Sequence, residues 1–265
     1  MTGTTATVLA SAFSAAGLDW IVPDWPAPTQ VCAIATTRSG GVSAGPYATM
    51  NLGRSGRDDA SAVAENQRRL KAYLPSPPVW LDQVHGTAVA TLTRVSAGLP
   101  TPVADAAVTR ECGVVCATLT ADCLPVLFAD RGGAAVGIAH AGWRGLAAGV
   151  LEATITALCD LGPSPDDLVA WLGPAIGPAR FEVGADVRDP FCASDHGAGA
   201  FFAPHRPGKW LADLYGLARR RLARGGVMRV SGGGFCTYTD TARFFSYRRE
   251  RASGRMAAAV WLAPD

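Results

Sequence analysis

Two histidines and one cysteine are the residues of this chain best suited to chemistry: His85 in WLDQVHG, Cys123 in TADCLP and His140 in AHAGWRG. A catalytic zinc site typically has three protein ligands and one open position for water or substrate. Two imidazoles and one thiolate satisfy that number and suit zinc, although the same donors also bind copper. A cysteine beside a histidine can instead act as a nucleophile with its base. The sequence therefore predicts a metal centre or a thiol nucleophile.

The local sequence brings two of these residues together. VLFAD and GAAVGIAH predict two strands of one hairpin, joined by a tight turn at the Arg-Gly pair between them. If Asp130 opposes Gly133, Cys123 lies opposite His140, with Cβ atoms about 5 Å apart on one face of the sheet. Pro125 lies inside the first strand and indicates a sheet edge or a bulge. A one-residue bulge would place the pair on opposite faces.

Charged residues near these motifs are candidates for supporting roles. Asp122 would point to the opposite face of a regular strand from Cys123, so we expect a structural carboxylate rather than a ligand. Arg144 in HAGWRGL lies where a strand turns into a helix, and free backbone N–H groups there favour an anion. Arg38 in the RSGG turn and Arg248 in FSYRR are further candidates to bind substrate or phosphate. The alternative is an ordinary N-terminal turn for Arg144 and a surface position for Arg38 and Arg248.

The composition bounds the class of protein. Of the 265 residues, 49% are hydrophobic and 17% are charged, which is typical of a globular protein with a substantial core. The net charge of +2 argues against a dedicated nucleic-acid-binding protein. Only Lys71 and Lys209 are lysines, so 22 of the 24 cationic residues are arginines. Arginine suits bidentate phosphate contacts better than lysine does.

Cysteine usage and hydropathy indicate the compartment. The seven cysteines are irregularly spaced and form neither a zinc-finger array nor a disulfide framework, which favours a reducing environment. The N-terminal segment lacks the basic stretch of a signal peptide, and no apolar run reaches membrane-spanning length. We therefore expect a soluble cytoplasmic protein that does not enter a membrane.

The apolar pattern predicts alternating strands and helices. Residues 1–18, rich in Ala, Ser and Thr, are expected to form a loose extension. Helices are expected where apolar residues recur at helical spacing, at 60–74, 142–162 and 211–226. Strands are expected at 31–37, 79–95, 113–121, 125–130, 134–141, 168–177, 228–239, 243–249 and 256–263. This succession, with several hairpins, predicts a mixed-sheet α/β domain.

The same motifs resemble the laccase-domain family, also called multicopper polyphenol oxidases, peptidoglycan editing factors or purine nucleoside phosphorylases. QVHG, TADCLP and HAGWRG together are highly specific, and further matches run in order from about residue 19 to the C-terminus. The resemblance places the metal-binding His, Cys and His of the family on His85, Cys123 and His140. It implies a four-layer α/β/β/α fold, shared with the catalytic domain of the cytotoxic necrotizing factors. One domain would span 19–265, with 1–18 as an N-terminal extension.

The resemblance also implies an activity. Phosphorolysis of adenosine, guanosine or inosine, and methylthioadenosine would give the free base and a ribose 1-phosphate or methylthioribose 1-phosphate. Adenosine deamination would accompany it. The implied cofactor is zinc, with copper as the other candidate. The implied partners are purine nucleosides and phosphate, in a monomer or a small homo-oligomer.

Three other functions compete with this one. A peptidoglycan editing hydrolase would remove L-Ser from UDP-MurNAc-L-Ser, with Cys123 as nucleophile and His140 as base. A copper polyphenol oxidase of the laccase type needs several copper ions bound mostly by imidazoles, and the chain has only four histidines. A non-enzymatic partner of the cell-wall machinery would have no use for a His/Cys/His set.

Overall fold

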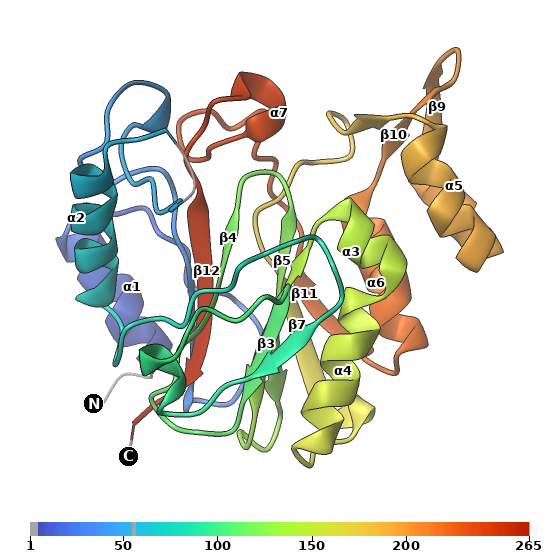
Figure 1. Cartoon of the computed structure of the whole chain (residues 1–265). Coiled ribbons are helices and arrows are strands. Elements are labelled where there is room, and N and C mark those ends of the chain that lie inside the picture. The colour runs from blue at the N-terminus through green and yellow to red at the C-terminus, as the bar shows by residue number, and fades with distance from the viewer. Residues whose placement is uncertain (1–4, 55–56, 265) are drawn as a thin grey trace.

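Two β-sheets pack face to face, and helices cover the outer face of each (Figure 1). The computed structural model describes residues 5–54 and 57–264. The smaller sheet has the order β1 (Val31–Ala35), β12 (Met256–Leu262), β4 (Cys116–Thr120), with both pairs antiparallel. Helices α1 (Thr5–Ala15) and α2 (Ala60–Lys71) lie against it.

The larger sheet is mixed and has six strands. Their order is β11 (Arg229–Gly232), β7 (Leu168–Leu172), β5 (Leu124–Asp130), β6 (Val136–Ala141), β3 (Ala106–Thr109) and β2 (Val89–Thr91). The β11–β7 and β3–β2 pairs are parallel, and the others are antiparallel. Helices α3 (Trp143–Ala148), α4 (Val150–Asp160) and α6 (Leu214–Arg224) cover its outer face. The predicted four-layer α/β/β/α fold is therefore confirmed.

A small lobe stands beside these layers (Figure 1). Its sheet has the order β8 (Glu182–Val183), β10 (Lys209–Ala212), β9 (Phe202–Arg206), and α5 (Ala185–Ser194) packs on it. The remaining elements are short: the single-turn helix α7 (Tyr247–Glu250) and the 3₁₀ turns η1 (Gly45–Tyr47), η2 (Ser96–Gly98), η3 (Pro165–Asp167) and η4 (His196–Phe201). None of the helices in 5–54 and 57–264 is long and apolar enough to cross a membrane.

Strand alternation explains the layers. In β12, Ala259 and Trp261 pack with α1 and α2, while Val260 and Leu262 pack between the sheets. Side chains of a strand alternate between its faces, so a strand that is apolar throughout must be covered on both sides. In β6, Ile138 faces the smaller sheet. His140 is two residues further along the strand, so its side chain points to the same face.

The predicted hairpin of β5 and β6 exists, but the predicted register is wrong by two residues. Residues 131–134 form the turn, and the Asp130 carboxylate accepts the N–H groups of Gly132 and Ala134. Pro125, not Cys123, is therefore the residue opposite His140. Because the shift is an even number, Cys123 stays on the same face as His140 and becomes its diagonal neighbour.

Pro125 lies in a central strand, and the expectation of an edge or a bulge is wrong. β5 pairs with both β6 and β7. The Pro125 carbonyl accepts a hydrogen bond from Gly173 N at 2.9 Å. Because the nitrogen and the carbonyl of one strand residue point toward the same neighbouring strand, the Pro125 nitrogen, which carries no hydrogen, also faces the β7 side. The last ladder pair there is Val126 with Leu172. Proline is tolerated because it stands where this ladder ends.

Four other segments differ from the expectation. His85 lies in a bend with φ 61° rather than inside a strand, and only Val89–Thr91 of that segment forms β2. Residues 243–249 form a loop and the start of α7, with Phe244 and Phe245 buried. The helix expected at 142–162 is divided into α3 and α4 by Gly149, whose φ is 105°. Finally, residues 5–15 of the expected loose extension form α1.

Replacement of Phe13 by Ala should lower the free energy of unfolding by about 3 kcal/mol. Phe13 is 2% exposed and contacts the rings of Trp20 and Tyr73, with centroids 5.3 and 5.2 Å away, so its loss leaves a cavity under α1. Urea unfolding measures the change. The control is Val8→Ala on the same helix, where the side chain is 58% exposed and the loss should stay below about 0.5 kcal/mol. Equal effects of the two substitutions would contradict the packing of α1.

Candidate functional site: a His/Cys/His cluster in a basic cavity

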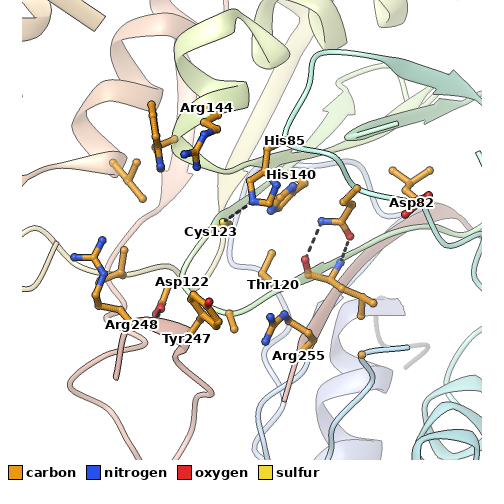
Figure 2. Close-up of a pocket in the computed structure, with 18 of the residues that line it drawn as sticks. Asp82, His85, Thr120, Asp122, Cys123, His140, Arg144, Tyr247, Arg248 and Arg255 are labelled. Carbon is orange, nitrogen blue, oxygen red and sulfur yellow. Dashed lines mark hydrogen bonds between the residues drawn. The ribbon is translucent and has the colours of Figure 1, made fainter. Parts of the chain in front are cut away.

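The structure brings the three residues singled out from the sequence together. One ligand atom from each of His85, Cys123 and His140 lies within 4.8 Å of the others. Cys123 Sγ is 3.8 Å from His85 Nε2, and the two imidazole rings are 4.9 Å apart between centroids. Cys123 directly precedes β5, His140 lies near the end of β6, and His85 reaches in from the loop before β2 (Figure 2).

Asp105 is a residue of this site that the sequence reasoning missed. It directly precedes β3 and lies opposite His140 in the antiparallel β3–β6 ladder, where His140 N donates to Asp105 O at 2.7 Å. The Asp105 carboxylate is fully buried and lies 2.8 Å from His140 Nδ1. It also accepts backbone N–H groups from residues 84–86. The only signal in the sequence is an acidic residue just before the apolar run AAV.

The cluster fits a metal ion. Zinc binds histidine nitrogen at about 2.0–2.1 Å and thiolate sulfur at about 2.3 Å, so tetrahedral ligand atoms lie roughly 3.3–3.7 Å apart. Donors already within 4.8 Å of one another need to approach by about 1 Å. The donor set of two imidazoles and one thiolate suits zinc or a single copper ion. Metal-ligating histidines typically have a carboxylate on their other ring nitrogen, and Asp105 lies in that place beside His140.

Neighbouring charges make Cys123, which is half-buried, unlike the buried thiol of Cys116. Burial raises the pKa of the Cys123 thiol, but the charge of His140 and hydrogen bonds from both histidines outweigh it and lower the pKa to about 6. Burial lowers the pKa of His140, but Cys123 and Asp105 outweigh it and raise the pKa to about 9. Cys116, buried in β4, has a pKa raised by burial to about 12. The site thus favours a thiolate at neutral pH, the form that binds metals and attacks electrophiles.

Two glycines of HAGWRG leave room for the cluster. A Cβ on Gly142 would lie 2.7 Å from His85 Cδ2 and 3.1 Å from Cys123 Sγ. A Cβ on Gly145 would lie 2.8 Å from the carbonyl oxygen of Gly86, in the loop that carries His85. The distances of 2.7 Å at Gly142 and 2.8 Å at Gly145 are shorter than non-bonded contacts allow. The motif therefore needs glycine at these positions for close approach rather than for a special backbone angle.

The cluster opens into a cavity of about 960 Å³. Its lining includes four arginines, Arg54, Arg144, Arg248 and Arg255, and none of these four forms an ion pair with a carboxylate of the described residues. Figure 2 shows Arg144 and Arg248 on one side of the histidines and Arg255 on another. The lining also includes apolar side chains, among them Trp143, Ile176, Phe181 and Leu214. This lining suits an anionic or phosphate-requiring ligand with an apolar part.

The predicted arginines divide into two groups. Arg144 stacks on Trp143 with 4.3 Å between its guanidinium carbon and the ring centroid, and Arg248 donates to the Glu182 carbonyl. Both line the cavity, whereas Arg38 does not. The guanidinium of Arg38 donates to the carbonyls of Ala48 and Thr241 and lies 3.8 Å from Glu250. The Arg38 guanidinium thus ties loops together outside the cavity, and a phosphate contact at this residue stays a prediction.

Asp122 is a structural carboxylate, as expected. Its side chain accepts from Thr237 Oγ1 and from Arg248 N, both at 2.6 Å. These bonds join the start of β5 to α7 and to the loop around Thr237. The backbone of Asp122 has φ 87°, so the strand turns sharply just before Cys123. This turn is a tertiary feature that strand periodicity does not predict.

Comparisons with known proteins agree with the architecture. A family model described as multi-copper polyphenol oxidoreductase laccase matches residues 32–263. A purine nucleoside phosphorylase of Pseudomonas aeruginosa is 55% identical over 246 residues, which cover 92% of this chain and 98% of that protein. The purine nucleoside phosphorylase YfiH of Escherichia coli is 53% identical, over 91% of this chain and 98% of its own length.

Solved structures of other proteins resemble this one over most of the chain. The crystal structure of a Neisseria meningitidis protein has a TM-score of 0.88 and 46% identity, covering 93% of this chain and 100% of that one. The crystal structure of YlmD from Geobacillus stearothermophilus has a TM-score of 0.79 and 32% identity, covering 89% of this chain and 93% of that one.

Replacement of Gly142 by Ala should weaken metal binding at the cluster by at least about tenfold, because the added methyl group displaces the His85 ring. Titration against a chromophoric chelator gives the dissociation constant. The matched control is Gly98→Ala, where a Cβ would meet none of the described atoms within 4 Å. A Gly142→Ala protein that binds zinc as tightly as the control would show that the cluster does not hold the metal.

Proposed function

The chain belongs to the multi-copper polyphenol oxidoreductase laccase family, and we propose that it is a zinc-dependent purine nucleoside phosphorylase. Its substrates would be adenosine, guanosine or inosine, and methylthioadenosine, and it would also deaminate adenosine. The observation that carries the proposal is one cavity lined by both the His/Cys/His cluster and arginines that form no ion pair with a carboxylate of the described residues. Relatives at 53–55% identity bear the name purine nucleoside phosphorylase.

The cavity has the size and lining that phosphorolysis needs. A volume of about 960 Å³ lies near the upper end of the range for small-molecule sites and has room for a nucleoside with phosphate. In the reaction a phosphate oxygen bonds to C1′ of the ribose while the bond from C1′ to the purine nitrogen breaks. The purine leaves with the bonding electron pair and takes up a proton. Arg144 and Arg248 are proposed to hold the phosphate, because guanidinium groups bind it bidentately.

The cluster would serve both phosphorolysis and deamination. His85, Cys123 and His140 are the proposed ligands of zinc, with copper as the other candidate. A bound zinc ion would supply Lewis-acid chemistry, which can activate water toward C6 of adenosine or polarise the nucleoside. Asp105 and the glycines of HAGWRG fix the geometry of the ligands. The cavity wall of Trp143 and Phe181 offers aromatic surface for the purine.

Laccase activity is not supported by the ligands present. The chain has four histidines. His196 begins η4 and His205 lies in β9, where it is 3.5 Å from Glu182, and neither belongs to the His/Cys/His cluster. Two imidazoles and one thiolate can bind one copper ion, but a cluster of several copper ions needs more imidazoles than this.

A second candidate is the peptidoglycan editing hydrolase, and one observation favours it. Cys123 has a pKa lowered to about 6, next to a histidine whose other nitrogen faces a buried carboxylate. Nucleophile, base and orienting group are the parts of a covalent hydrolase. Activity that survives metal removal and is blocked by alkylation of Cys123 would favour this route. A stoichiometric metal whose removal abolishes turnover favours the nucleoside reactions.

Incubation with adenosine should give adenine and ribose 1-phosphate only when phosphate is present, and inosine with or without it. Chromatography of the products, with the metal content measured on the same sample, tests this.

Cys123→Ala should abolish both products and the bound metal, because it removes the thiolate ligand. The control Cys159→Ala lies outside the cavity and should keep both. Full adenosine cleavage by Cys123→Ala would refute the site.

Replacement of Arg144 by Lys should raise the KM for phosphate about tenfold, because the bidentate contact is lost while the charge remains. The KM for adenosine should change much less. Steady-state kinetics with each substrate varied in turn separates the two effects. The matched control is Arg110→Lys, an exposed arginine outside the cavity, which should leave both values unchanged. An unchanged phosphate KM in Arg144→Lys would remove this arginine from the phosphate site.

A further inference from the structure

We infer that Asp105 is a positioning residue for both histidines of the cluster: it selects the ring nitrogen that His140 offers and holds the backbone that carries His85. This inference rests on the proposed metal centre but not on the proposed substrate. It concerns a carboxylate that touches neither the cavity nor the ligand atoms directed into it.

The two oxygens of Asp105 have separate tasks. Oδ1 lies 2.8 Å from His140 Nδ1 and accepts the N–H of His85 at 2.9 Å. Oδ2 accepts the N–H of Gly86 at 2.6 Å and that of Val84 at 3.1 Å. The side chain is fully buried. Each oxygen already acts as an acceptor for at least one backbone N–H group.

The contact with His140 determines which nitrogen reaches a metal. Both oxygens of Asp105 accept hydrogen bonds from backbone N–H groups, so the carboxylate is the acceptor in its contact with His140 and Nδ1 supplies the hydrogen. In the neutral ring Nε2 then keeps its lone pair, and this atom is left to face Cys123 and the cavity. The β3–β6 register keeps the side chains of Asp105 and His140 opposite each other. The pairing of the strands therefore determines which ring nitrogen of His140 carries the hydrogen.

The contacts with residues 84–86 hold the part of the loop that carries His85, between the attachments of Gln83 to Leu119 and of the Ala88 carbonyl to Asp105 N. His85 has a backbone φ of 61°, a left-handed conformation that is strained for a residue other than glycine. The neighbouring Val84 side chain is 57% exposed, so it does not anchor the loop by burial. Three N–H groups converging on one carboxylate hold the backbone at His85 itself. Without them the backbone that carries the His85 ring would lose its direct hydrogen bonds to the β3 side of the site.

An asparagine of the same size cannot replace Asp105. An amide nitrogen in place of Oδ2 would face the N–H groups of Val84 and Gly86, so donors would oppose donors and release the loop of His85. An amide nitrogen in place of Oδ1 would donate to His140 Nδ1 and force the proton onto Nε2. Either orientation disables one of the two histidine ligands. The charge and the two acceptor oxygens are therefore both required.

The test is Asp105→Asn in the full chain, with zinc affinity and the visible spectrum of the Co²⁺-loaded protein as readouts. We expect affinity to fall about 10- to 100-fold and the strong tetrahedral cobalt bands to weaken. The matched control is Asp130→Asn, which also removes a buried carboxylate that accepts two backbone N–H groups, but at the opposite end of β6. Both variants lose stability, so only a positioning role separates them. Equal zinc affinity and equal cobalt spectra would overturn the inference.

A measurement on the unaltered protein decides the matter even if Asp105→Asn does not fold. In zinc-loaded protein labelled with ¹⁵N-histidine, His140 Nδ1 should carry a slowly exchanging proton and Nε2 should bind the metal. Coordination through Nδ1 would overturn the inference. Failure of the nucleoside assay with these metal results intact would count against the proposed substrate alone. Absence of any metal binding by the unaltered protein would instead end the proposed centre, and this inference with it.

Discussion

The site depends on one buried charge, the carboxylate of Asp105, at the place where the space between the two sheets changes from apolar packing to a cavity. An unpaired ion in this position would cost several kcal/mol, so its four hydrogen-bond partners are needed for the fold as well as for the site. Those partners come from β6 and from the loop before β2. Satisfying one carboxylate therefore assembles two of the three candidate ligands.

The layers around this carboxylate make the arrangement rigid. β6 is covered by the smaller sheet on one face and by helices on the other, so His140 cannot move without disturbing two cores. Cys123 is fixed by the sharp turn at Asp122, whose carboxylate joins three segments. His85 alone lies on a loop. Three hydrogen bonds from residues 84–86 to Asp105 hold the backbone of this loop.

The chemistry of the site follows from neighbours rather than from residue type. Cys116 and Cys123 are thiols of the same chain, yet burial raises the pKa of Cys116 to about 12, while the adjacent histidines bring that of Cys123 to about 6. The arginines show the same contrast. Arg38 uses its guanidinium to join loops, whereas Arg144 leaves its guanidinium available in the cavity.

The sequence alone determined the residue types of the cluster and the periodicity of the main strands and helices, because both are local properties. It also placed Cys123 and His140 on one face, since a register error of two residues preserves the face. The tertiary structure decided the rest. The exact register, the central position of Pro125, the helix at 5–15 and the loop at 243–249 depend on packing partners distant in sequence. Asp105 shows the reason most clearly: an acidic residue before a strand carries no local sign that four donors from two other segments will converge on it.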